Sequence, residues 1–201
     1  MKQIIKYINI LGNIIILNIL FILTSALTAF TCTGTSLSAL YATFLDLKTD
    51  DSGYYVRNYF KHWKNNFKQT IIFNIAIILL FVAAYLNCLM INTIKDSTVK
   101  LLLFAVVGLF VLELSLVSSF IYPVIAKFEG KKLELLYLSF VFAHKYIYIS
   151  ILFIILMILS IYLVVFVSFA FIFIIFGLVV YIESLILKYL WRGYQYEISE
   201  L

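Results

Sequence analysis

One carboxyl group inside a long apolar stretch is the clearest candidate for chemistry in this sequence. Glu113 lies about midway along the run Val99–Tyr122, and three serines follow it at Ser115, Ser118 and Ser119. An ionisable side chain is costly in lipid, so an ionisable residue inside a span is a candidate functional residue. Two roles are open for Glu113. It is either a structural carboxyl, protonated or bonded to a serine, or a contact for a solute or a cation.

Amide side chains are also unusually frequent in the apolar stretches. The first stretch holds Asn9, Asn13 and Asn18, and the next long one holds Asn74 and Asn87. Amides in lipid form hydrogen bonds between helices and thereby fix their packing. The same residues could instead line a polar cavity for a carbohydrate. In that case the candidate intramembrane polar site comprises Glu113, Ser115, Asn74, Asn87 and Asn13.

The sequence contains no recognisable catalytic or metal-binding motif. His62 and His144 each lack a Cys, Asp or Glu at ligand spacing, and the two cysteines are far apart and form no CxxC. No Walker loop, GxSxG, HExxH or paired carboxylate is present. Glu183 lies near the end of the last apolar run, before Lys188, and is expected to form a helix-end ion pair or tether. We therefore expect no enzymatic activity, no cofactor and no metal, with any energy for transport supplied by another subunit.

The elements that hold these residues must be membrane helices, because the composition excludes a water-soluble fold. Apolar residues make up 65% of the chain and charged residues 12%, whereas soluble domains contain about 45–50% and about 25%. A helix bundle in lipid accommodates this composition. We expect a single transmembrane domain over residues 1–201, whose first helix is retained rather than cleaved as a signal peptide. The net charge of +5 is attributed to membrane topology and not to nucleic-acid binding.

Five apolar runs reach the length of about 20 residues that a spanning helix needs. They are Ile8–Phe30, Thr70–Asn92, Val99–Tyr122, Tyr146–Val167 and Ser168–Leu190. The last two abut, so a tight turn near Val167–Ser168 must separate them. A sixth segment, Thr31–Leu47, is only mildly apolar and begins with TCTGT, a run that interrupts helices. The predicted fold is therefore all-α, a polytopic transmembrane helix bundle of five long spans plus one short returning or re-entrant helix.

The distribution of Lys and Arg predicts the orientation of these spans. Basic residues are concentrated in Lys48–Lys68 and in the connection from Lys127 to Lys145, and both segments should be cytoplasmic. With both chain termini also in the cytoplasm, Thr31–Leu47 has to bring the chain back across or into the membrane. A five-span protein with its N-terminus outside is the alternative, and it stays open.

Two amphipathic segments are predicted on the cytoplasmic surface. The first, Tyr54–Gln69, is expected to be a separate in-plane helix with an apolar and a basic stripe, formed by Val56, Phe60, Trp63 and Phe67 and by Arg57, Lys61, Lys64 and Lys68. The second follows Pro123, which is expected to end the third long run. It carries Leu133, Leu136 and Phe140 on one face. Such helices either anchor a chain at the membrane surface or contact a partner's cytoplasmic face.

Three stretches together resemble the YesL family of bacterial integral membrane proteins. They are GTSLSALY (Gly34–Tyr41), FKHWKNNFKQT (Phe60–Thr70) and IYPVIAKFEGKKLELL (Ile121–Leu136). The family usually has prolines where Ala29 and Thr35 stand in this sequence. The positions that match the family are Gly34, Ala39, Tyr41, Asn66, Phe67, Pro123, Lys127 and Phe128.

The resemblance implies an association with carbohydrate uptake and provides no catalytic residue. Members of the family are associated with ABC importers of oligosaccharides, so the expected function is that of an accessory subunit in the bacterial cytoplasmic membrane. Its expected partners are the lipid bilayer, the permease subunits and, through them, an ATPase. A substrate-binding membrane subunit like those of energy-coupling-factor importers and a regulatory or scaffold protein are the alternatives. The expected partner or membrane-surface contacts are Arg57, Lys61, Trp63, Lys64, Asn66, Phe67, Lys68, Pro123, Lys127 and Phe128.

Overall fold

The computed structural model describes residues 2–28, 31–46 and 54–199, and this part of the chain is helical apart from short connections. The helices are α1 (Lys2–Leu27), α2 (Thr33–Asp46), α3 (Tyr55–Asn92), α4 (Ser97–Lys127), α5 (Lys132–Lys145), α6 (Ile147–Tyr162) and α7 (Ile175–Ser199). Two short segments, η1 (Leu163–Val167) and η2 (Phe169–Phe173), connect α6 to α7. The expected all-α class is thereby confirmed for the described residues.

Among the described residues, four helices are long and apolar enough to cross a membrane, as expected of a helical membrane protein. They are Ile8–Leu27, Tyr55–Asn92, Ser97–Lys127 and Ile147–Val167. These four correspond to the first four predicted spans. The predicted fifth span, Ser168–Leu190, is not among them, so the count of five long spans is not confirmed.

Helix α2 lies at the centre of the molecule. It packs against α1, α3, α4 and α7, and ten of its 14 residues are buried. A helix of this length is about 21 Å long, which is shorter than the hydrocarbon layer of about 30 Å. The predicted short helix in Thr31–Leu47 is therefore present, and it supplies the core of the fold.

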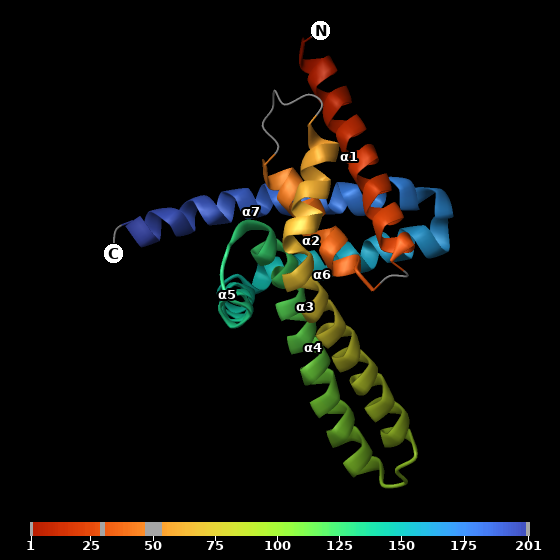
Figure 1. The fold of residues 1–201 in the computed structure, drawn as a ribbon. Helices are drawn as coiled ribbons and strands as arrows, with labels where there is room; N and C mark the ends of the chain where they lie inside the picture. The colour runs from red at the N-terminus through yellow and green to blue at the C-terminus, as the bar shows by residue number, and fades with distance from the viewer. Residues whose placement is uncertain (1, 29–30, 47–53, 200–201) are drawn as a thin grey trace.

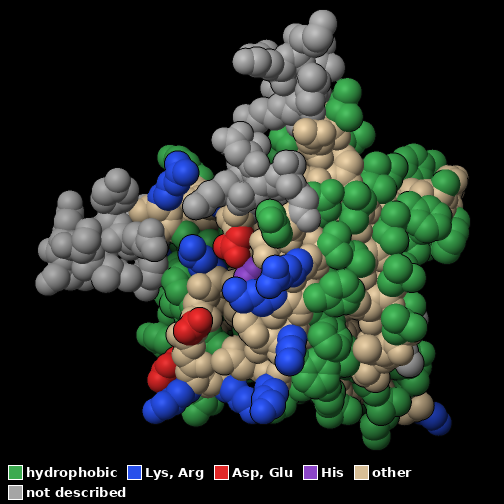
Figure 2. Space-filling view, turned by 45° about the horizontal axis from the view of Figure 1, so that its top comes forward, with side chains coloured by type: hydrophobic (Ala, Val, Ile, Leu, Met, Phe, Trp, Pro, Cys, Tyr) green, Lys and Arg blue, Asp and Glu red, His purple; other side chains and the backbone are tan. Residues whose placement is uncertain are grey.

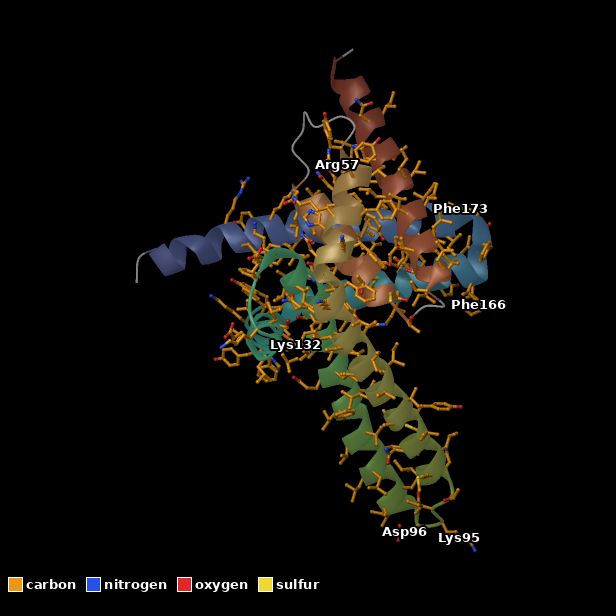
Figure 3. The ribbon with its side chains drawn as sticks, viewed as in Figure 1. Arg57, Lys95, Asp96, Lys132, Phe166 and Phe173 are labelled. Atoms are coloured by element: carbon orange, nitrogen blue, oxygen red, sulfur yellow. The ribbon has the colours of Figure 1, made fainter. Side chains whose placement is uncertain are left out.

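The long helices α3 and α4 form a hairpin that extends away from the other helices, while α6 and α7 lie across it (Figure 1). The connection between α3 and α4 lies at the far end of the hairpin, where Lys95 and Asp96 are labelled in Figure 3. Asp96 caps the first turn of α4, because its Oδ1 accepts hydrogen bonds from the backbone N–H groups of Thr98 and Val99 at 2.8 and 3.1 Å. The hairpin thus has charged side chains at its far end.

The predicted separate helix Tyr54–Gln69 is wrong, because α3 runs without interruption from Tyr55 to Asn92. No Gly or Pro stands between these residues, so nothing interrupts the backbone hydrogen bonds where the basic segment meets the apolar one. The expectation that Pro123 ends a helix is also wrong. Helix α4 includes Pro123 and ends at Lys127. The next residue, Phe128, has an extended backbone. Membrane helices tolerate an internal proline because neighbouring groups satisfy the freed backbone atoms.

The predicted break near Val167–Ser168 is confirmed. Ser168 has an extended backbone with φ −164° and ψ 134°, and it separates the π-helical η1 from the 3₁₀-helical η2. The Ser168 hydroxyl accepts a hydrogen bond from the N–H of Ala170 at 3.3 Å. The chain therefore turns at this serine between α6 and α7.

Candidate functional site

Hydroxyl groups in the core join α1, α2 and α3 at one point. Thr24 Oγ1 lies 2.8 Å from Ser36 Oγ and 2.8 Å from the Tyr59 hydroxyl. Trp63 Nε1 donates a hydrogen bond to the same Ser36 oxygen at 3.3 Å. Because Thr24, Ser36 and Tyr59 are buried, these bonds satisfy polar groups that lipid could not satisfy.

A second set of hydrogen bonds joins α2 to α3 further along both helices. Asn66 Nδ2 donates to Ser38 Oγ at 2.9 Å, and the hydroxyls of Thr35 and Thr70 lie 2.7 Å apart. Asn66 was expected to contact a partner or the membrane surface, as was Trp63. In the structure, both are half-buried and donate a side-chain hydrogen bond to a serine of α2.

The other expected surface residues fall into two groups. The four cations of the basic stripe are exposed: Arg57, which Figure 3 labels, Lys61, Lys64 and Lys68. Lys127 is exposed as well, whereas Pro123 is buried and Phe67 and Phe128 are half-buried. Phe67 packs against Trp63 with ring centroids 5.2 Å apart, and Phe128 packs against Trp191 at 5.5 Å.

Asn74 connects three helices at the start of α2. Its Nδ2 donates to the backbone oxygen of Thr31 at 2.8 Å, and its Oδ1 accepts a hydrogen bond from the Tyr122 hydroxyl at 2.9 Å. Gly34 makes this approach possible. A Cβ atom at Gly34 would lie 2.9 Å from Asn74 Oδ1 and 3.0 Å from Tyr122 Cζ.

Asn18 joins α1 to η2 and to the start of α7. Its Nδ2 donates to the Ile172 oxygen at 2.8 Å, and its Oδ1 accepts from the Gly177 N–H at 2.8 Å. Gly177 is needed here, because an added Cβ would lie 2.7 Å from Asn18 Cβ. Asn18 therefore holds two segments of the chain together. Asn13, in the same span, is half-buried.

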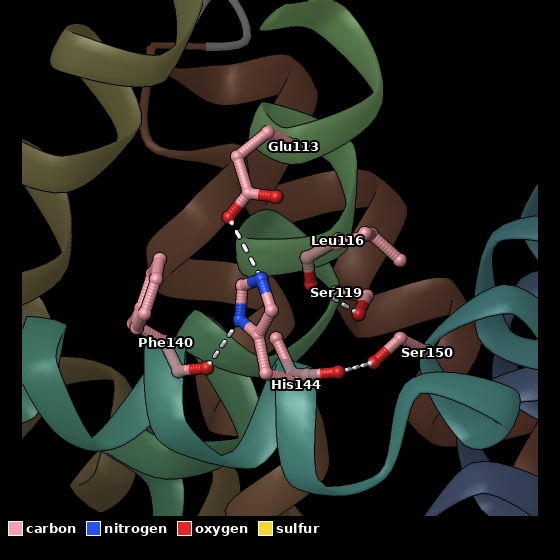
Figure 4. Close-up of polar contacts among 7 residues, drawn as sticks. Glu113, Leu116, Ser119, Phe140, His144 and Ser150 are labelled. Atoms are coloured by element: carbon pink, nitrogen blue, oxygen red, sulfur yellow. Dashed lines mark hydrogen bonds and ion pairs between the residues drawn. The ribbon is translucent and has the colours of Figure 1, made fainter. Parts of the chain in front are cut away.

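Glu113 pairs with His144 from α5 (Figure 4). Glu113 Oε1 lies 3.3 Å from His144 Nε2, and both side chains are about two-fifths exposed. His144 Nδ1 lies 2.9 Å from the backbone oxygen of Phe140. Nothing in the sequence pointed to this pair, since the residues are 31 positions apart on different helices and neither stands at motif spacing.

The geometry shows which ring nitrogen of His144 carries a proton. A backbone oxygen only accepts hydrogen bonds, so His144 Nδ1 carries a proton and donates it to Phe140. On its other side the imidazole approaches Glu113 Oε1 at 3.3 Å, but this oxygen has no hydrogen-bond partner among the described residues. The pair therefore links α4 to α5 by proximity of the two groups.

The predicted polar site is divided between separate places. Glu113 contacts His144, whereas Asn74 contacts Tyr122, which lies nine residues later on α4 and hence about 14 Å further along the helix. Ser115 and Asn87 donate to oxygens of their own helices, at 2.7 and 2.8 Å. Each of these four residues therefore has its own separate contact within the chain.

A buried carboxyl that the sequence placed in a helix-end tether lies in the core. The Glu183 side chain is fully buried, and the Tyr41 hydroxyl from α2 donates a hydrogen bond to its Oε2. Its Oε1 is buried without a hydrogen-bond partner. Glu183 thus ties α7 to α2. Among the described residues, no group of three His, Cys, Asp or Glu side chains could hold a metal ion.

Comparison with known proteins found one similarity. A family model described as "Protein of unknown function, DUF624" matches residues 14–88. No curated protein and no solved structure matches the chain. The matched segment contains most of α1, all of α2 and most of α3, together with two of the three stretches that carry the YesL resemblance. The chain is therefore similar to the DUF624 family over the helices that hold the buried hydroxyl groups.

Proposed function

We propose that this protein is a non-enzymatic accessory subunit of a carbohydrate ABC importer in a bacterial cytoplasmic membrane, where it binds the permease subunits laterally. The resemblance to the YesL family supports the association with carbohydrate import. In this proposal both termini are cytoplasmic, and the ATPase of the importer supplies the energy.

The observation that carries the proposal is the use of the buried polar side chains. The buried Asn18 and Asn74 and the half-buried Asn66 each bond to another helix of the same chain. A solute-binding subunit needs polar groups that converge on one cavity, and here the predicted set is divided and engaged in packing. This arrangement favours an interaction protein over the substrate-binding alternative.

The α3–α4 hairpin offers the surface for a lateral partner. Its apolar side chains are widely exposed, including Leu79 at 62%, Met90 at 70% and Leu101 at 71%. In Figure 1 the hairpin extends beyond the other helices, so neighbouring helices can reach several of its sides. A permease helix can pack there, while the exposed basic stripe at the start of α3 faces the cytoplasmic side of the same partner.

A pull-down of the tagged protein from its native membrane in mild detergent tests the proposal. Recovery of two permease subunits and an ATPase at fixed stoichiometry is the expected result. Changing Arg57, Lys61 and Lys64 together to Ser should weaken this recovery. The matched control changes Lys95 and Lys100 to Ser at the far end of the hairpin and should not weaken it. Recovery of the protein alone would overturn the proposal and direct attention to solute binding.

A further inference from the structure

The contact between α7 and α2 contains a carboxyl group that is shielded from solvent. The Glu183 side chain has an exposed fraction of 0%, and the Tyr41 hydroxyl donates to its Oε2. Its Oε1 is buried without a hydrogen-bond partner in the described part of the chain. Val180 and Leu187, about one turn away on either side, are also buried. The carboxyl group thus receives one described hydrogen bond in apolar surroundings.

The ion pairs between described side chains do not include Glu183. They involve His62 and His144. Lys188 follows Glu183 by five residues on α7, which places it about 140° round the helix. On the face that Figure 2 draws, the acidic side chains lie at the surface near Lys, Arg and His side chains, whereas Glu183 lies inside the molecule.

The elements packed against α7 bring one titratable group to this carboxyl. These elements are α1, α2, α6 and η2. In Ile8–Leu27 of α1, in α6 and in η2 there is no Asp, Glu, Lys, Arg or His. Helix α2 contributes Tyr41, which is the donor, and Asp46, which is exposed and pairs with α3. The tyrosines of α6 are exposed, namely Tyr148 and Tyr162.

A carboxylate ion is far more costly in this place than a carboxylic acid. A buried carboxyl without a cation takes up a proton instead of remaining charged. Oε1 can carry this proton, since Oε2 already accepts from Tyr41.

We propose that Glu183 is protonated at neutral pH and that its proton holds α7 against α2, so that the pair acts as a pH-sensitive switch. When Glu183 ionises, its charge needs water, and α7 moves away from α2 to admit it. The switch needs no partner protein and is therefore independent of the proposed accessory function.

Infrared spectroscopy of the purified protein in detergent tests the protonation state. The carbonyl band of a carboxylic acid differs from the bands of a carboxylate. Wild type at pH 7 should show an acid band that Glu183→Gln lacks and that Glu129→Gln, which changes an exposed carboxyl, retains. Tyr41→Phe should keep the acid band to a higher pH than wild type, because it removes a donor that favours the ionised form.

Thermal unfolding tests whether the proton stabilises the fold. In the unfolded chain a glutamate ionises at about pH 4, so above this pH unfolding releases the Glu183 proton. Wild type should therefore lose about 3–5 °C of unfolding temperature per pH unit relative to Glu183→Gln. This loss should end where the carboxyl of the folded protein ionises. Glu129→Gln should follow wild type throughout.

Tryptophan fluorescence reports the movement of α7. Trp191 on this helix is 4% exposed, and its emission should shift to longer wavelengths in alkaline buffer in wild type but not in Glu183→Gln. Trp63 on α3 contributes equally to both proteins. The proposal is overturned if wild type lacks the acid band at pH 7, if Glu183→Gln retains it, or if the unfolding temperatures or emission spectra of the two proteins change in parallel with pH. If Glu183→Gln does not fold, an acid band in Tyr41→Phe that disappears at the same pH as in wild type overturns it.

Discussion

Replacing Gly34 tests whether close approach at the start of α2 holds the core together. In Gly34→Ala the new methyl group would lie 2.9 Å from Asn74 Oδ1 and 3.0 Å from Tyr122 Cζ, and it would lie closer still to Tyr122 Cε1. Carbon atoms make favourable contact at about 3.5–4.0 Å, so the Tyr122 ring has to move by about 1 Å. Its hydroxyl donates to Asn74, and this shift therefore strains the hydrogen bond as well.

The expected loss of stability combines three contributions. Overpacking a close contact costs about 1–3 kcal/mol, and weakening one hydrogen bond costs about 1 kcal/mol. Alanine regains about 1 kcal/mol because it favours a helix more than glycine does. We expect a net destabilisation of about 1–3 kcal/mol, which corresponds to an unfolding temperature lower by about 2–12 °C.

Thermal unfolding in detergent, followed by loss of helical signal, measures this difference. Gly108→Ala on α4 is the matched control, because nothing lies within 4 Å of a Cβ atom placed there. It should raise the unfolding temperature slightly through helix propensity alone. Tyr122→Leu should make Gly34→Ala less costly than it is in the wild type, since the clashing ring is absent. If Gly34→Ala and Gly108→Ala shift the unfolding temperature in the same direction, the packing argument fails.

Three further predictions concern polar contacts. The contact between His144 Nδ1 and the Phe140 oxygen requires a proton on Nδ1. Nitrogen NMR should show this proton in both wild type and Glu113→Gln, and only the Nε2 signal should change between them. An unprotonated Nδ1 would contradict the hydrogen bond to Phe140. Asn18→Ala removes one hydrogen bond from α1 to η2 and one to the start of α7, and it should cost about 2–4 kcal/mol, measured as a lower unfolding temperature. The lowered pKa of Asp46 makes its pairing with His62 a source of stability above about pH 4 that is lost as the pH falls further. The difference in unfolding temperature between wild type and His62→Gln should therefore shrink below pH 4, and a constant difference would refute this origin.

Sequence reasoning succeeded where length and backbone chemistry decide the outcome. The break at Ser168 followed from an apolar stretch too long for one helix, and the short helix in Thr31–Leu47 followed from basic segments on both sides of it. Reasoning failed where side-chain stripes were taken as evidence for a boundary. The basic and apolar stripes of Tyr54–Gln69 describe the faces of a helix, but only a Gly, Pro or turn residue could have ended that helix before Asn92.

The partners of the polar residues could not be read from the sequence. Glu113 was found because a carboxyl in an apolar run is conspicuous, whereas His144 was assigned to no partner. Pairing between helices depends on which faces meet, and periodicity within one helix carries no information about the facing helix. The same limit applies to Tyr41 and Glu183, which are 142 positions apart.

Membrane packing explains why so many polar side chains of this sequence form contacts between helices. In lipid the hydrophobic effect does not hold helices together, so small residues and hydrogen bonds between helices have to do so. Helix α2 is short and only mildly apolar, and it is retained at the centre through Ser36, Ser38, Tyr41 and the close contact at Gly34. A chain with this many buried polar groups therefore does not need a substrate to account for them.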